Sequence, residues 1–196
     1  MYRKRFFLAI SFVLVLFFLG CGGLRYNQMH SEGKDFHPKR IGILPVAVGS
    51  FAEAQGIIDQ AVATALTEKK WFSRVVSEEA LIRQAGTNPE LQEAVTAYLD
   101  KLDKLNYSDP ELTQKIGELS QVDALLIVSL DFWNYTRDAD TKIAKVGLGM
   151  RMANVVTGTL IWEARHFTAE RFLVIKPELA DIAISLTKEM AGYMPR

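Results

Sequence analysis

The chain contains a single cysteine, Cys21, and this residue limits how a chain of this kind can be stabilised. With no second cysteine, no intramolecular disulfide can form, so the folded part must be held together by its hydrophobic core. Cys21 follows a segment with the order of a secretory signal: Arg3, Lys4 and Arg5 supply positive charge, and residues 6–19 are almost wholly apolar.

The apolar run is too short for a permanent transmembrane helix. Its 14 residues would rise about 21 Å as a helix, whereas the hydrocarbon core of a bilayer is roughly 30 Å thick. The run ends in Phe18-Leu19-Gly20-Cys21, which resembles the lipobox of bacterial lipoproteins, although Phe18 stands where leucine is usual. We therefore interpret residues 1–20 as a lipoprotein signal peptide and Cys21 as the site of lipid attachment.

The position of the only cysteine favours this interpretation over an ordinary cleaved signal or an uncleaved anchor, because Cys21 falls where the processing chemistry needs it. Gly22 follows the cysteine. In enterobacterial lipoproteins an aspartate at this position resembles an inner-membrane retention signal, and this chain lacks it. The resemblance implies attachment to the periplasmic face of the outer membrane through acyl chains, palmitate among them, with the inner membrane as the alternative.

The charge balance excludes a nucleic-acid partner. After removal of residues 1–20 the chain has 20 basic and 23 acidic residues and a formal charge of −3. This balance provides no electrostatic footprint for nucleic acid and no polybasic membrane patch, so membrane attachment would rest on the acyl chains.

Hydrophobic periodicity predicts one periplasmic α/β domain over residues 40–196, joined to Cys21 by a flexible tether over residues 21–39. Strands are predicted at 41–48, 74–76, 123–133, 142–154 and 160–165, and helices at 56–70, 78–84, 90–105 and 109–121, with a final helix after Pro177. The last two strands should form an antiparallel hairpin. The element order indicates a mixed β-sheet flanked by helices. Residues 88–108 are interpreted as a helical insertion.

A second set of motifs, spread over roughly residues 38–166, resembles a known group of envelope proteins. The motifs are Arg40-Ile41-Gly42-Ile43-Leu44-Pro45, Trp71-Phe72-Ser73-Arg74-Val75-Val76, Val122-Asp123-Ala124-Leu125-Leu126-Ile127 and Asn154-Val155-Val156-Thr157-Gly158-Thr159-Leu160-Ile161-Trp162. They resemble the periplasmic α/β domain shared by the curli secretion channel lipoprotein CsgG, the penicillin-binding-protein activator LpoB and the exopolysaccharide-export lipoprotein PelC. Members of this group act as pores, enzyme activators or assembly accessories. The chain has no long amphipathic hairpin of the curli channel type, so the resemblance implies an accessory or regulatory role.

No arrangement of residues predicts catalysis, a cofactor or a metal site. The three histidines, His30, His37 and His166, have no zinc-site spacing. Asp123 begins a strand, and Asp138 and Asp140 lie in a predicted turn, where aspartate is common. No nucleophile elbow, P-loop or dinucleotide-binding motif is present in the sequence.

Aromatic residues are the best candidates for partner contact. Trp133 and Tyr135 run into a polar loop and are predicted to be exposed, whereas Trp162 is expected in the core. Gly147 and Gly149 would let the backbone of another subunit approach, as in a homo-oligomer.

These observations favour a non-enzymatic envelope lipoprotein that binds another envelope protein, as an activator or assembly factor for peptidoglycan synthesis or for export. A ring component of a secretion or polysaccharide-export apparatus is the alternative. A periplasmic hydrolase is the third reading, and it lacks a recognisable nucleophile and base.

The lipoprotein interpretation predicts a specific mass change. Intact mass spectrometry of the membrane-extracted protein should show that residues 1–20 are lost and that acyl mass is gained, and Cys21→Ala should show neither change. A wild-type protein that keeps its unmodified N-terminus would contradict the interpretation.

Overall fold

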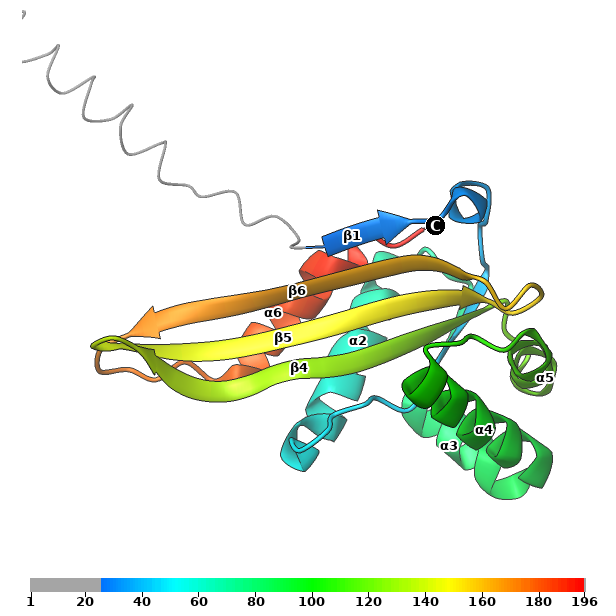
Figure 1. The fold of residues 1–196 in the computed structure, drawn as a ribbon, viewed down its shortest axis with the longest axis horizontal. Coiled ribbons are helices and arrows are strands. Elements are labelled where there is room, and N and C mark those ends of the chain that lie inside the picture. Colours follow the sequence, from blue (N-terminus) through cyan, green and yellow to red (C-terminus); the bar gives the residue numbers. More distant parts are fainter. Residues whose placement is uncertain (1–25, 196) are drawn as a thin grey trace, which may run out of the picture.

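The computed structural model describes residues 26–195, and its sheet is built around three long antiparallel strands. These are β4 (Ala124–Asp138), β5 (Thr141–Asn154) and β6 (Leu160–Phe172), which follow one another in the chain and lie side by side (Figure 1). The short strands β2 (Arg40–Ile43) and β3 (Arg74–Val76) add parallel to β4, and the sheet order is β1-β6-β5-β4-β2-β3. The predicted α/β class with a mixed sheet is confirmed.

Five α-helices flank the sheet in the described residues. α2 (Gln55–Lys69) and α6 (Leu179–Ala191) cover one face, and α3 (Glu78–Thr87), α4 (Pro89–Leu105) and α5 (Pro110–Ser120) lie beside one end of the sheet (Figure 1). Short 3-10 turns, η1 (Ser31–Lys34) and η2 (Ala52–Ala54), precede β2 and α2. The predicted order of elements from residue 40 onward is confirmed.

Local chemistry explains where α3, α4 and α5 begin. The Ser77 hydroxyl accepts a hydrogen bond from the backbone N–H of Ala80, and Asn88 and Asp109 each accept two such bonds at the starts of their helices. A proline occupies the first helical position of α4 and of α5, where a missing N–H costs nothing.

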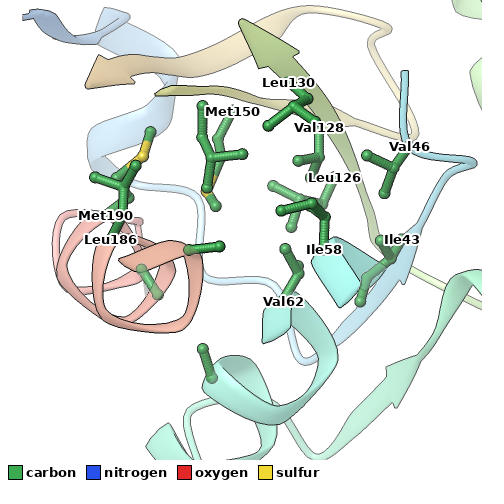
Figure 2. Close-up of a cluster of buried hydrophobic side chains, with 14 of the residues drawn as sticks. Ile43, Val46, Ile58, Val62, Leu126, Val128, Leu130, Met150, Leu186 and Met190 are labelled. Atoms are coloured by element: carbon green, nitrogen blue, oxygen red, sulfur yellow. The ribbon is translucent and has the colours of Figure 1, made fainter. Parts of the chain in front are cut away.

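The larger core lies between the sheet and the helix pair α2 and α6. Figure 2 shows it as an interdigitated set of aliphatic and sulfur-containing side chains from both layers: Ile43, Val46, Ile58, Val62, Leu126, Val128, Leu130, Met150, Leu186 and Met190. Alternate residues of each strand supply this set, because successive side chains of a strand point to opposite faces.

A second core contradicts the interpretation of residues 88–108 as an insertion. Leu91, Tyr98 and Leu102 of α4 belong to a buried cluster that also contains Leu125 and Ile127 of β4 and residues of α3 and α5. The Tyr98 hydroxyl also pairs with the Ser108 hydroxyl at 2.9 Å. Residues 88–108 are therefore part of the folded domain. They help to cover one end of the sheet face opposite α2 and α6.

Residues 26–39 are not a tether. β1 (Tyr26–Met29) pairs antiparallel with β6, Trp162 donates its indole N–H to the Asn27 side chain at 2.9 Å, and His30 donates its backbone N–H to Ile161. The tether prediction was wrong here because all β1 side chains are exposed, so the strand has no hydrophobic period and is held by its backbone ladder. Residues 1–25, which include the predicted signal peptide and the predicted lipid attachment site Cys21, lie outside the described residues.

Two helical glycines provide a test of the packing between α5 and the sheet. A Cβ at Gly117 would overlap the Val155 side chain, whereas a Cβ at Gly86 would meet open space. Gly117→Ala should therefore lower the free energy of unfolding by about 1–3 kcal/mol, and Gly86→Ala should raise it by about 0.5–1 kcal/mol. Urea unfolding followed by circular dichroism measures both, and equal effects at the two positions would contradict the close packing of α5.

Candidate protein-binding surface

A β-bulge in β4 decides which aromatic side chains of this strand are buried. Leu126, Val128 and Leu130 point into the larger core, and the register against β5 then shifts between Leu130 and Phe132. Because Asp131 is an extra residue at this point, the core-facing positions continue at Trp133 instead of Phe132.

The predicted exposure of Trp133 was therefore wrong. Trp133 is only 8% exposed and packs in the larger core, while its neighbour Phe132 is 36% exposed. Tyr135 is half-buried, its hydroxyl donates to the Pro177 carbonyl oxygen at 2.8 Å, and its ring meets Phe172 edge-on at 6.1 Å. Trp162 is fully buried, as predicted.

The face of β4, β5 and β6 opposite the larger core is uncovered over most of its length. We call this surface the outer face, and its central residues are Ser129, Phe132, Lys145, Gly147, Gly149, Arg165 and Phe167. α3, α4 and α5 cover only the end of the sheet near β2 and β3 (Figure 1). No helix of the described residues lies over the remainder.

An aromatic pair with a cation occupies the middle of the outer face. The Phe132 and Phe167 rings meet edge-on with centroids 5.7 Å apart. The Lys145 ammonium lies 3.4 Å from the Phe132 centroid and 4.5 Å from the Phe167 centroid, which is favourable because the ring faces carry negative potential. The three side chains therefore form a preorganised patch on the strands.

The two glycines of β5 make room for this patch and not for another chain. A Cβ at Gly147 would come within 2.5 Å of the Phe132 ring, and a Cβ at Gly149 would come within 2.6 Å of the Ser129 hydroxyl oxygen. The expectation that these glycines leave space for the backbone of another subunit was wrong, because neighbouring side chains of the same sheet fill that space.

The outer face has a basic excess. Lys145, Arg151, Arg165 and Arg171 project from it, whereas Glu163 and the bulge residue Asp131 are its acidic side chains. The Arg165 guanidinium is 3.8 Å from the Asp131 carboxylate, and Arg151 donates to the Asn106 side chain at 3.1 Å. Such a surface is complementary to an acidic partner surface.

The residues considered for metal or acid–base chemistry do not converge. Among residues 26–195, no group of three or more His, Cys, Asp or Glu side chains could hold a metal ion. His30 and His37 are exposed, and the His166 ring nitrogen lies 3.6 Å from a Glu189 carboxylate oxygen.

Asp123 has a structural role. Its carboxylate accepts hydrogen bonds from the Arg40 guanidinium, the shorter at 2.6 Å, and from the backbone N–H groups of Lys39 and Arg40. These bonds, the guanidinium first, lower the pKa of Asp123 and align β2 with β4.

A carboxylate pair between Asp59 of α2 and Glu78 at the start of α3 was not predicted. Glu78 is 3% exposed, and its carboxylate oxygens accept from the Val46 backbone N–H at 3.1 Å and the Gln55 amide at 3.0 Å. Asp59 accepts from the Glu78 backbone N–H at 3.2 Å. Burial raises the pKa of both carboxyl groups. Both Glu78 carboxylate oxygens accept hydrogen bonds within the fold. The pair therefore connects α2, α3 and the segment after β2.

Comparisons with known proteins give no match to a family model or to a curated protein sequence, but they do give solved structures of the same fold. A PelC dodecamer structure from Paraburkholderia phytofirmans is 12% identical with a TM-score of 0.53, and the match covers 87% of this chain and 98% of that chain. Lipoprotein GNA1162 from Neisseria meningitidis is 13% identical with a TM-score of 0.53, over 79% and 99% of the two chains. A Xanthomonas campestris protein of the family DUF330 is 7% identical with a TM-score of 0.50, over 81% and 86%.

These similarities establish a shared fold. The predicted resemblance to PelC is thus matched at the level of fold, and the wider resemblance to the curli channel and to the penicillin-binding-protein activator stays a prediction. In the described part of the chain, every helix falls short of the length and apolar character needed to span a membrane.

The carboxylate pair formed by the buried Glu78 and the half-buried Asp59 should make stability depend on pH. Because the folded-state pKa values of Glu78 and Asp59 are raised, their contribution is fully present below the ordinary carboxyl pKa of about 4 and is lost as the pH rises through the raised values. In urea unfolding, Glu78→Gln should show a shallower loss of stability than wild type as the pH rises above about 4. Parallel pH profiles for the two proteins would contradict this role of Glu78.

Proposed function

We propose that this chain is a lipid-anchored protein of the bacterial cell envelope that acts by binding another envelope protein and not by catalysis. The observation that carries the proposal is the outer face, a rigid strand surface with an aromatic pair, a basic excess and no covering helix. Exposed aromatic and arginine side chains on a preorganised surface are typical of sites that supply binding energy.

Anchoring through Cys21 supports the same role. A protein held at the periplasmic face of the outer membrane meets a restricted set of partners, and a lipid anchor would concentrate the outer face near them. An activator or assembly factor for peptidoglycan synthesis or for export fits this arrangement. The partner surface should be acidic, since the outer face carries more cations than carboxylates.

The second candidate is a ring subunit of an export apparatus. Its support is the fold similarity to PelC, whose solved structures are dodecamers. In this case the partner of the outer face would be a second copy of the chain. Rings arise from head-to-tail contacts between two different surfaces of each subunit, so the outer face would meet another surface of the neighbouring copy.

Site-specific photocrosslinking in the producing cells distinguishes these functions. A photoreactive phenylalanine analogue at Phe132 places the probe on the outer face, and the same analogue at the half-exposed Ile184 of α6 is the matched control. We expect adducts at position 132 that are absent at position 184, and mass spectrometry identifies the crosslinked chain.

The identity of the adduct decides between the candidates. A different envelope protein supports the binding role, whereas a second copy, together with a ring-sized mass in light scattering, supports the export ring. Adducts at position 184 with none at position 132 would overturn the assignment of the outer face.

A further inference from the structure

Three consecutive apolar side chains after β6 are almost fully exposed. Leu173, Val174 and Ile175 are 85%, 91% and 86% exposed, more than any other large apolar side chain in the described residues. We call these residues the apolar tip. A contiguous exposed apolar run is unfavourable in water, so it commonly marks a surface that is covered in the working state of a protein.

The apolar tip is held at the far end of the long strands. Figure 1 shows β4, β5 and β6 projecting together past the helices, with the β4–β5 turn and the end of β6 at the same extremity. The base of the tip is fixed, since Tyr135 donates to the Pro177 carbonyl oxygen and the Lys176 ammonium lies 3.6 Å from the Tyr135 ring centroid. The apolar side chains are therefore presented away from the core.

The direction of β1 places the start of the described chain on the side of β1 that faces this same end. β1 is antiparallel to β6, and Tyr26 lies opposite Arg165, so the chain enters β1 from the side of the tip. From Arg165 to Phe172, β6 advances roughly 23 Å. Cys21 precedes Tyr26 by five residues, which span at most roughly 18 Å when fully extended. Even when fully extended toward the tip, Cys21 therefore stays about 5 Å short of the level of Phe172, and a tilt of the strands relative to the bilayer would bring Cys21 and the tip to one membrane surface.

Charge at the edges of the tip suits a phospholipid surface. Lys176 follows the tip directly, Arg171 precedes it by one residue, and Lys142 lies opposite Phe172 on the neighbouring strand, so these cations outnumber Asp140 of the nearby β4–β5 turn. Cations beside a short apolar run match the interfacial zone of a bilayer, where the apolar side chains enter the acyl region and the cations stay among the headgroup phosphates.

We propose that the apolar tip is a second membrane contact, inserted into the same leaflet as the acyl chains on Cys21. The proposal rests on the lipid anchorage of the proposed function. A short apolar segment binds a bilayer weakly by itself, but the acyl anchor keeps it at the surface, so a weak contact is sufficient. With the tip inserted, β4, β5 and β6 extend from the membrane and the outer face stays in the aqueous space.

A fluorescent label on an added cysteine tests the contact in the full-length protein. If Cys21 is acylated, Val174→Cys supplies the only reactive thiol for an environment-sensitive dye. The matched control is Val156→Cys, which is 75% exposed and lies in the β5–β6 turn at the opposite end of the strands. Both labelled proteins are placed in vesicles of phosphatidylethanolamine and phosphatidylglycerol that contain nitroxide-labelled lipids.

We expect the dye at position 174 to shift its emission to shorter wavelength and to be quenched at least twofold more by the lipid nitroxides than the dye at position 156. Equal quenching at the two positions overturns the membrane contact. A dye at position 174 that is shielded from water but is not quenched by the lipid nitroxides also overturns it, because that result indicates that a protein covers the tip.

Intact mass spectrometry of the same samples distinguishes a failure of the tip contact from a failure of the lipid anchor. An acylated protein whose position 174 stays in water overturns the tip contact and leaves the lipid anchor intact. A protein with an unmodified Cys21 overturns the anchor, and the tip contact that rests on it fails as well.

Discussion

Burial of one face of β4, β5 and β6 is the constraint on which the rest of the structure depends. α2 and α6 cover that face along the strands, and the residues that alternate with the buried ones must point the other way. α3, α4 and α5 cover only one end of this second face. The strands are longer than these helices can cover, and this mismatch leaves both the outer face and the apolar tip in solvent.

The bulge at Asp131 changes which side chains of β4 are exposed, at the position of the proposed binding surface. One extra residue exchanges the two faces of the strand, so Trp133 joins the core and Phe132 joins the outer face. Without the bulge, the larger indole ring and Tyr135 would be the exposed aromatics. The glycines opposite the bulge complete the arrangement because they let the Phe132 ring and the Ser129 side chain lie close over β5.

The fold is shared with lipoproteins whose sequences are about one eighth identical, which means that packing is retained while surfaces are free to differ. In such a fold, function depends on surface residues that packing does not require. Here these residues are the Phe132, Lys145 and Phe167 group on one surface and the apolar tip on another. Together they are the basis of the two proposals, a membrane contact at one end of the strands and a protein contact along the outer face.

The sequence by itself determined the elements, because helix periods, caps and strand alternation are local: Asp109 begins α5, Trp162 is buried, and the order of elements from residue 40 follows the predicted one. The exposed run that begins at Leu173 is visible in the sequence as part of four consecutive apolar residues between Arg171 and Lys176, but helix and strand periodicity does not predict its exposure. Only the tertiary structure decided that Tyr26–Met29 pair with β6, that α4 belongs to a second core, and that Phe132 replaces Trp133 at the surface. Each of these depends on contacts between residues distant in the chain or on a one-residue register shift, and neither leaves a period in the local sequence.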